Sequence, residues 1–444
     1  MKHKRTHLFI AVGVGLGLIL ALLCTLQAPS SSALAQTGLE SVPPSLTREH
    51  DPVVIGGSLL PDLTGSPLDQ IFVYAFQDAV PIQIPSQIDE RDDNGTYVPT
   101  EDGQLDDNDE LVFMAMDAGG WVDDPSLDVD GTPITPTYVI TLTDPISDTH
   151  AWAYVFRSST LSRTFTADYV SYDEGNDRIT SPGWYAIGFT ATYAFQDYLT
   201  LGSSSLDLLD RNKLRVAGTA LGFPVSADEE DFSKHTTYAI DGPVRVTRVS
   251  TSTFDVLGEA AQITTDLFAY RSLVVQPATT IVPDDPFDIA YYRSSMDWNE
   301  QASGMTFYDA NNPTGVTING ITDTITISPP TRWTQVTGST GTAVSVSDIP
   351  AGLGGTQSTY YKDNSAVDSD DTGDQRSYGD AGLQVEDPNP GIYTVLGQSY
   401  FLTGTVVNVG ATFADYYDHP LQVSVAAGPG PLSYDIYLPL IMNK

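Results

Sequence analysis

The sequence predicts an all-β protein with two or more antiparallel β-sandwich domains, or one large supersandwich, and few helices. Short segments rich in β-branched and aromatic residues recur along the chain, and Gly, Pro, Asn and Asp separate them. Only one segment has the pattern of a helix. A length of 444 residues with 41% hydrophobic content supplies enough apolar side chains for large cores.

The expected strands run from the N-terminal part of the chain to its end, at 71–76, 138–142, 151–156, 244–249, 325–328, 394–396, 405–409 and 421–425. A tight hairpin is expected at Asn319-Gly320, because its turn needs positive φ. The candidate helix is 205–214, with Ser205 as its N-cap, although this segment can equally run into a strand before Val216.

The N-terminal residues 1–35 have the layout of a secretory signal peptide. Basic residues precede an apolar run from Leu8 to about Leu26, and Ala33-Leu34-Ala35 provides a small-residue cleavage site. An uncleaved membrane anchor is the alternative, because the apolar run is nearly long enough to span a bilayer. We therefore expect a secreted or cell-surface protein.

Two further breaks divide the rest of the chain. The acidic stretch 223–232 contains a proline, and 426–431 is rich in Gly and Pro. These breaks predict a first sandwich domain over 45–222, a second over 232–426, and a linker with an apolar C-terminal tail over 427–444.

Charge excludes several classes of partner. The leader holds three of the 20 basic residues and none of the 57 acidic ones, so the mature chain carries a formal charge of −40. Such a surface repels nucleic acid and anionic lipid, so neither nucleic acid nor, after cleavage, a membrane is expected as a partner. Cations and a polysaccharide or cell-envelope component remain as candidates; the alternative is that acidity serves solubility alone.

Stability must also come without disulfides. Cys24 is the only cysteine and lies in the leader. An exported chain without disulfides depends on a large core, on metal ions, or on both.

Residues 89–110 contain ten carboxylates and one arginine, and we predict a calcium site there. With Gly95 as the sharp-turn glycine of an EF-hand-like loop, the ligand positions one, three, five and twelve fall on Glu90, Asp92, Asn94 and Glu101. Asp106 and Asn108 could complete that site or form a second one. Pro99 disfavours the helix that follows a true EF-hand loop, and a solvated acidic turn is the alternative.

A second candidate calcium loop contains Asp368, Asp370 and Asp374. Its spacing is less complete, because Gly379 occupies position twelve, and Asp374 or Asp380 would have to replace the bidentate ligand. A flexible acidic loop is the alternative.

Three short segments resemble known patterns. Tyr437-Leu438-Pro439-Leu440-Ile441, followed by Lys444, resembles a C-terminal signature of exported proteins of filamentous bacteria. Residues 72–119, with a Gln-Ile-Asp-Glu turn, resemble a recurrent module of uncharacterised exported bacterial proteins, and the acidic loop resembles dockerin and EF-hand-like calcium loops. These resemblances imply a secreted or surface location, and they assign no catalytic residues.

Standard catalytic motifs are missing from the sequence, which leaves enzymatic activity undecided. We predict a calcium-stabilised β-sandwich protein with a structural or glycan-interacting role. The alternative is a carbohydrate-active enzyme, a polysaccharide lyase or glycoside hydrolase, on a galactose-mutarotase-like sandwich; its cleft would contain Lys234, His235, Tyr238, Arg245 and Arg248. Aromatic residues such as Trp298, Trp333 and Tyr360-Tyr361 could form a glycan platform, or they could fill the core.

Overall fold

The computed structural model describes residues 41–256, 259–428 and 435–436. The predicted signal peptide and most of the predicted C-terminal tail lie outside the described residues. Strands dominate the described part, which confirms the predicted all-β class, and one α-helix, α1 (Gly410–Asp418), is found in it. Within these residues no helix has the length and apolar character required to cross a membrane.

The N-terminal sheets form a first sandwich. A six-stranded sheet has the order β31 (Asp435–Ile436), β30 (Gln422–Ala427), β10 (Tyr138–Asp144), β11 (Thr149–Arg157), β3 (Ile71–Gln77) and β4 (Val80–Gln83). A three-stranded sheet has the order β2 (Pro52–Gly56), β6 (Glu110–Met114) and β5 (Ser86–Asp89). Alternating apolar side chains from both sheets fill one shared core, which includes Val73, Phe113, Ile140 and Val423.

The other face of the six-stranded sheet is covered by short elements. These are β7 (Trp121–Val122), which pairs with β1 (Ser41–Val42), and the hairpin of β8 (Leu127–Val129) and β9 (Thr132–Ile134). Phe72, Phe76, Tyr154 and Phe156 pack beneath them. The sheet is therefore apolar on both faces.

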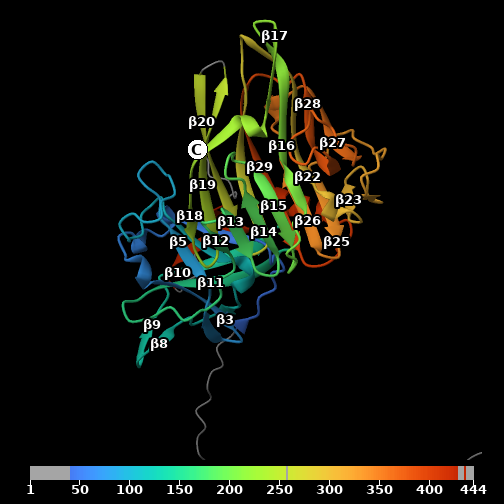
Figure 1. Cartoon of the computed structure of the whole chain (residues 1–444). Coiled ribbons are helices and arrows are strands. Elements are labelled where there is room, and N and C mark those ends of the chain that lie inside the picture. Colours follow the sequence, from blue (N-terminus) through green and yellow to red (C-terminus); the bar gives the residue numbers. More distant parts are fainter. Residues whose placement is uncertain (1–40, 257–258, 429–434, 437–444) are drawn as a thin grey trace, which may run out of the picture. The chain divides into compact units, whose positions relative to one another are not determined.

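Most of the remaining chain forms a larger sandwich of long antiparallel strands (Figure 1). Its nine-stranded sheet has the order β18 (Phe232–Asp241), β19 (Val246–Val256), β20 (Glu259–Ala269), β21 (Leu273–Val282), β29 (Gly391–Leu402), β26 (Gly341–Ser347), β25 (Trp333–Gly338), β23 (Thr306–Asp309) and β24 (Val316–Thr317). Its five-stranded sheet has the order β17 (Phe223–Asp228), β16 (Leu209–Ala220), β22 (Phe287–Trp298), β28 (Ser377–Glu386) and β27 (Thr356–Asn364).

A four-stranded sheet packs into the same core. It has the order β12 (Ser171–Asp173), β13 (Arg178–Ser181), β14 (Tyr185–Phe189) and β15 (Gln196–Leu201). Ile187 and Leu199 from this sheet share a core with Phe307, Val336 and Phe401. The large sandwich thus includes strands from before and after the stretch 223–232.

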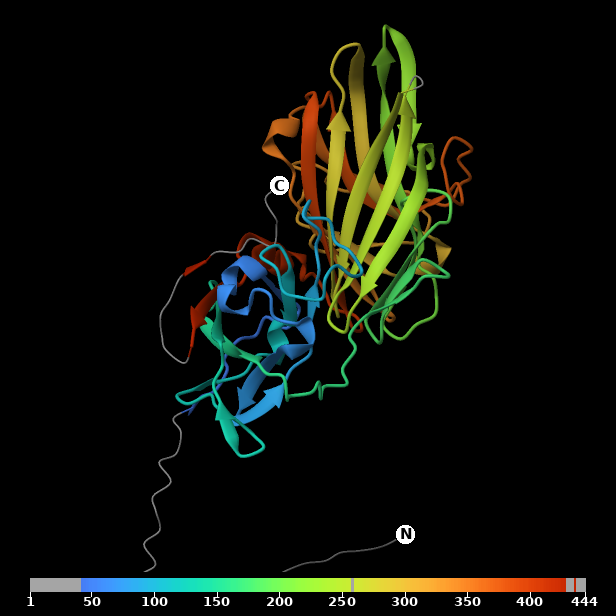
Figure 2. The same cartoon turned by 90° about the vertical axis from the view of Figure 1, so that its left-hand side faces the viewer.

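Strand pairing joins segments that the sequence assigns to different domains. β17 starts at Phe223 and pairs with β16, so the first part of the acidic stretch, up to Asp228, is an edge strand of the five-stranded sheet. β30 pairs with β10 over six residues and thereby adds a C-terminal strand to the N-terminal sheet. Figure 2 shows the red β30 beside the blue and green strands of that sheet.

Some local predictions were wrong. Segment 205–214 contains no helix; from Leu209 it belongs to β16, as the alternative prediction had it. Segments 325–328 and 405–409 are not strands, and Asn319-Gly320 does not join a hairpin. Gly320 does have positive φ, +72°, but its N–H and that of Asn319 donate to the carboxylate of Asp363. A side chain therefore stabilises this turn in place of strand pairing.

Candidate functional site

The acidic loop is the connection between β5 and β6, and its first half is a tight turn. Gly95 has a φ of +78°, the left-handed conformation expected of the turn glycine. The Asp92 carboxylate accepts the N–H groups of Asn94 and Thr96, at 2.9 Å each. These hydrogen bonds lower the pKa of Asp92, and the bond from the Thr96 N–H has the largest effect.

Several of the predicted calcium ligands form hydrogen bonds within the loop itself. Glu90 accepts the N–H of Gly103 at 2.7 Å, and the Asn108 side-chain amide donates to the carbonyls of Arg91 and Asp92. Asp109 is fully buried and accepts the N–H groups of Arg91 and Asp106. The carboxylates therefore act first as caps that hold the shape of the loop.

The remaining carboxylates repel one another. Desolvation, and then the charges of Asp109 and Asp106, raise the pKa of the exposed Glu101. The pKa of Asp106 is raised by desolvation and by neighbouring carboxylates that include Glu90. Glu90, Glu101 and Asp106 thus lie in one electrostatic neighbourhood, whereas Asp92 and the exposed Asn94 belong to the turn. In the part of the chain that the structure describes, no three His, Cys, Asp or Glu residues are arranged to hold a metal ion.

Both ends of the acidic loop bind Arg245, which comes from the large sandwich and is 2% exposed. The Arg245 Nε lies 2.7 Å from Asp89 Oδ2, and its Nη2 lies 2.7 Å from Glu110 Oε2. Gln87 accepts the backbone N–H groups of Val244 and Arg245 and donates to Asp89. The segment expected as a Gln-Ile-Asp-Glu turn is therefore mostly strand β5, and its Gln87 and Asp89 bind Arg245 together with Glu110 of β6. We call Gln87, Asp89, Glu110 and Arg245 the arginine clamp.

The residues of the alternative lyase cleft do not gather in one place. Arg245 belongs to the arginine clamp, while Lys234 and Arg248 both bind the carboxylate of Asp177, at 2.8 and 2.7 Å. The Tyr238 hydroxyl donates to the carbonyl of Tyr97, and His235 is exposed. Burial raises the pKa of Asp177, but the charges and hydrogen bonds of Arg248 and Lys234 outweigh it, so the pKa lies below its usual value and Asp177 pairs with both bases as an anion.

The second candidate calcium loop does not converge on a common point. Asp368 binds Lys362 and caps the N–H of Asp370, and Asp374 caps the N–H of Arg376. Asp371 is not one of the predicted ligands. It points inward and binds Lys213 and Arg215 at 3.1 and 2.6 Å. We call residues 365–376 the covering loop, since they lie over a cluster of charged side chains on β16, β22 and β28.

At the centre of that cluster is Lys213, which is 1% exposed. Its Nζ lies 2.6 Å from Asp297 Oδ2, 3.1 Å from Asp371 and 3.5 Å from Asp210. Asp380 is fully buried in the same cluster, and neither of its carboxylate oxygens accepts a hydrogen bond. Burial, followed by repulsion from Asp380, raises the pKa of Asp297 well above its usual value.

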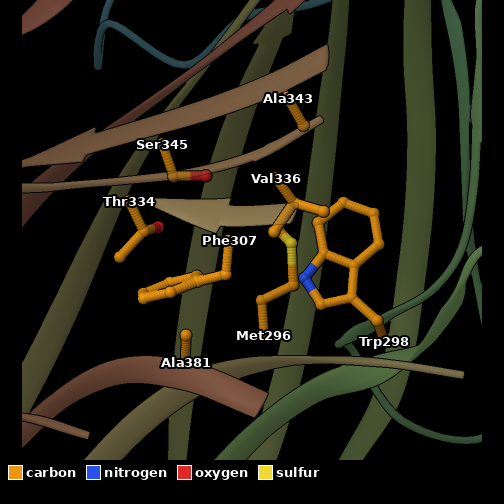
Figure 3. Close-up of a pocket in the computed structure, with 8 residues that line it drawn as sticks. All are labelled: Met296, Trp298, Phe307, Thr334, Val336, Ala343, Ser345 and Ala381. Atoms are coloured by element: carbon orange, nitrogen blue, oxygen red, sulfur yellow. The ribbon is translucent and has the colours of Figure 1, made fainter. Parts of the chain in front are cut away.

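Of the two alternatives for the aromatic residues, glycan platform or core filling, the two tryptophans take the second. Trp298 and Trp333 are 3% and 7% exposed. Trp298 lines a small cavity between the sheets of the large sandwich, together with Met296, Phe307, Thr334, Val336, Ala343, Ser345 and Ala381 (Figure 3). The cavity has room for about one water molecule, which the Thr334 and Ser345 hydroxyls could bind, and is too small for a sugar.

Three buried carboxyls predict a pH dependence of stability. Burial raises the pKa of Asp51, Asp117 and Asp210 to about 6, above the usual 3.8. A carboxyl whose pKa is higher in the folded state than in the unfolded state binds its proton more tightly when the protein is folded. Its protonation therefore stabilises the fold at low pH, and this contribution to the free energy of unfolding is lost as the pH rises from about 4 to about 6. We expect urea unfolding to show a fall in the free energy of unfolding on the order of 3 kcal/mol per group over this range.

The variant Asp117→Asn serves as the control for this pH dependence. It should make the fall smaller while leaving the contributions of Asp51 and Asp210. A free energy of unfolding that increases steadily from pH 4 to pH 7 would contradict the prediction.

Neither a protein-family model nor a curated protein matches the chain. Solved structures with some likeness include an alpha-mannosidase from Enterococcus faecalis V583 (10% identity, 88% of this chain, 44% of that chain, TM-score 0.44). A second is a glycosyl hydrolase family 38 protein from Enterococcus faecalis (10% identity, 87% of this chain, 47% of that chain, TM-score 0.43). A third is an alpha-N-acetylgalactosaminidase from Bifidobacterium bifidum (12% identity, 58% of this chain, 38% of that chain, TM-score 0.33). This chain spans less than half the length of each. At TM-scores below 0.5 the likeness assigns no activity to it.

Proposed function

We propose that the chain is a secreted or cell-surface β-sandwich protein, stabilised by calcium, with a structural or glycan-interacting role. One observation carries the proposal: the acidic loop starts and ends at the arginine clamp. Asp89 and Glu110 flank the loop, lie opposite each other in the pair of β5 and β6, and both hold Arg245. A cation bound in the loop would thereby stabilise the junction between the two sandwiches.

Electrostatics supports a cation at this place. Two carboxylates about 4 Å apart repel by about 4 kcal/mol at an effective dielectric of about 20, and Arg91 is the one basic residue of the loop. In the arrangement described, these side chains form no coordination shell. Binding would require the exposed Glu101 and the half-buried Asp106 to turn toward Glu90, whose carboxylate is held by Gly103. Calcium tolerates such irregular oxygen ligands.

Thermal unfolding of the full chain in calcium and in chelator tests this proposal. At a calcium concentration a hundredfold above Kd, we expect about 2.7 kcal/mol of stabilisation, seen as a higher unfolding temperature, together with heat in a calorimetric titration. The double variant Glu101→Gln/Asp106→Asn should lose most of both effects.

The matched control is Asp368→Asn/Asp370→Asn, which removes the same charge from the other acidic loop. Its calcium response should equal that of the wild type. If millimolar calcium produces neither heat nor a higher unfolding temperature in the wild type, the calcium part of the proposal fails.

A partly exposed aromatic pair supports the glycan-interacting role. Trp121 and Trp152 are half-buried and meet edge to face, with 6.0 Å between ring centroids, and the Trp121 indole donates to Asp123. An aromatic face next to a polar acceptor suits the apolar face and hydroxyls of a sugar. Electrophoresis in gels that contain a neutral or cell-envelope polysaccharide tests this role. The polysaccharide should slow the wild-type protein, and it should slow Trp152→Ala less. Equal mobility of the wild type in every gel would favour the structural role alone.

A further inference from the structure

Lys213 and Asp297 lie side by side on neighbouring strands of the large sandwich. In the antiparallel pair of β16 and β22, Lys213 is opposite Ser295 and Arg211 is opposite Asp297, so the two side chains are diagonal neighbours. Both side chains are 0% exposed. The amine nitrogen lies 2.6 Å from Oδ2 of the carboxylate, and it is therefore also within contact distance of the carboxyl carbon.

We propose that Lys213 and Asp297 condense to form an intramolecular isopeptide bond, and that Asp380 transfers the protons of this reaction. The bond would covalently join β16 to β22 within the five-stranded sheet. This inference does not depend on calcium binding or on a glycan partner.

Burial favours the condensation. In bulk water an ammonium and a carboxylate are strongly hydrated. A dry interior destabilises both charged forms, so less free energy is needed to convert the pair to the neutral amine and acid. A fixed contact between two reacting groups also corresponds to a very high effective concentration. Since one water molecule leaves the site when the amide forms, the neutral amide removes two charges from the core.

Asp297 is the better reaction partner among the three carboxylates near Lys213. Asp371 also binds Arg215, and its pKa is lowered overall despite burial, so it remains an anion and a poor electrophile. Asp210 is 3.5 Å away and accepts the N–H of Asp374. Asp297 is the nearest and the most buried, and its raised pKa favours the protonated carboxyl that an amine can attack.

Asp380 has the environment of a proton carrier. It lies on β28, the other neighbour of β22, and the charges of Asp380 and Lys213 both act on Asp297. Burial raises the pKa of Asp380, and both of its oxygens lack hydrogen-bond partners. Burial outweighs the charges of Arg293 and Lys213 and the nearby Ser295 hydroxyl, all of which lower the pKa of Asp380.

The chemistry balances without an additional reactant. The neighbouring carboxylates raise the pKa of Lys213, so the resting side chain is an ammonium and must first lose a proton, which Asp380 accepts. The neutral amine attacks the protonated carboxyl carbon of Asp297, and a C–N bond forms. Asp380 returns its proton to a hydroxyl of the tetrahedral intermediate, the C–O bond breaks, and water leaves; the proton shed by the nitrogen returns to Asp380.

Such a link would stabilise a chain that has no cysteine outside its leader. Lys213 and Asp297 are 84 residues apart in the sequence. Joining them would restrict the unfolded chain as a disulfide does, and reducing agents would not break the bond.

Peptide mapping of the full chain by mass spectrometry tests the proposal. Trypsin cannot cut after a linked Lys213, so peptide 212–215 should appear attached to peptide 294–332, lighter by one water, about 18 Da, than the sum of the two. Linkage to Asp371 or Asp210 would instead involve peptide 363–376 or 179–211. We expect the linked species to replace most of the free 294–332 peptide.

Two variants complete the experiment. Asp380→Asn should keep the fold, as circular dichroism can check, and should lose the linked peptide; Lys362→Gln, at a lysine paired with the exposed Asp368, should keep it. If the wild-type digest contains no linked species, or if water loss maps only to an Asp-Gly succinimide such as Asp130-Gly131, the isopeptide bond is refuted. A linked peptide that persists in Asp380→Asn would refute the role of Asp380.

Discussion

Replacing Arg245 with methionine is expected to lower the free energy of unfolding by about 3 to 5 kcal/mol. The variant removes the guanidinium but keeps an apolar side chain of similar length. Asp89, 1% exposed, would then lose its buried counter-charge, and Glu110, 5% exposed, would keep only the more distant Arg91 at 3.7 Å. Gln87 would keep its bonds to Asp89 and to the backbone, so the loss reports on the guanidinium. Urea unfolding followed by tryptophan fluorescence measures the change.

Arg332→Met is the matched control for this prediction. Arg332 pairs with Asp418 at 2.8 Å, but its side chain is 37% exposed. Exposed ion pairs contribute about 0 to 1 kcal/mol, so this variant should be nearly neutral. An Arg245→Met protein as stable as the Arg332→Met protein would show that the arginine clamp does not support the junction.

The arginine clamp also shows where sequence reasoning stopped. The sequence marks the Gln-Ile-Asp-Glu turn and the acidic loop, and the structure places the loop between β5 and β6. Arg245, however, was assigned to a hypothetical cleft because it stands near Lys234 and His235 in the sequence. Its partners are 135 and 156 residues away, and residue types alone do not reveal such pairing.

Strands with a clear alternation of side chains were easier to predict than turns and caps. Segments 71–76, 138–142 and 151–156 fall within β3, β10 and β11, whose side chains are buried on the sheet faces. The helix α1 was not predicted, since it has no side-chain N-cap and its first residue is Gly410. That glycine fits because a Cβ there would lie 2.0 Å from the Trp333 ring.

The charged cluster around Lys213 had a weak signal in the sequence. Lys213 is one of four lysines after residue 35 and stands in a segment with many apolar residues. Asp380 was considered only as a substitute ligand for the second calcium loop. Its proximity to Asp297 follows from the pairing of β22 with β28, which the register in the sheet sets and the local sequence does not.

The C-terminal strand β30 leads to the second large effect. Val423 is 6% exposed, pairs with Leu142 of β10, and packs into the core of the first sandwich. We expect Val423→Asp to cost about 4 kcal/mol or more, because a carboxyl without a partner would be buried among apolar side chains. Because β30 lies between β31 and β10 in the N-terminal sheet, the loss should appear in that sheet, as faster proteolysis of residues 71–157.

Ser424→Asp provides the control on the same strand. Ser424 is half-buried and points to the opposite face of the sheet, so the added charge can reach water and should cost less than half as much as Val423→Asp. Hydrogen exchange of β10 and β3 in the two variants distinguishes them. If both variants exchange these amides at the wild-type rate, β30 contributes no stability, and the N-terminal sheet folds without the end of the chain.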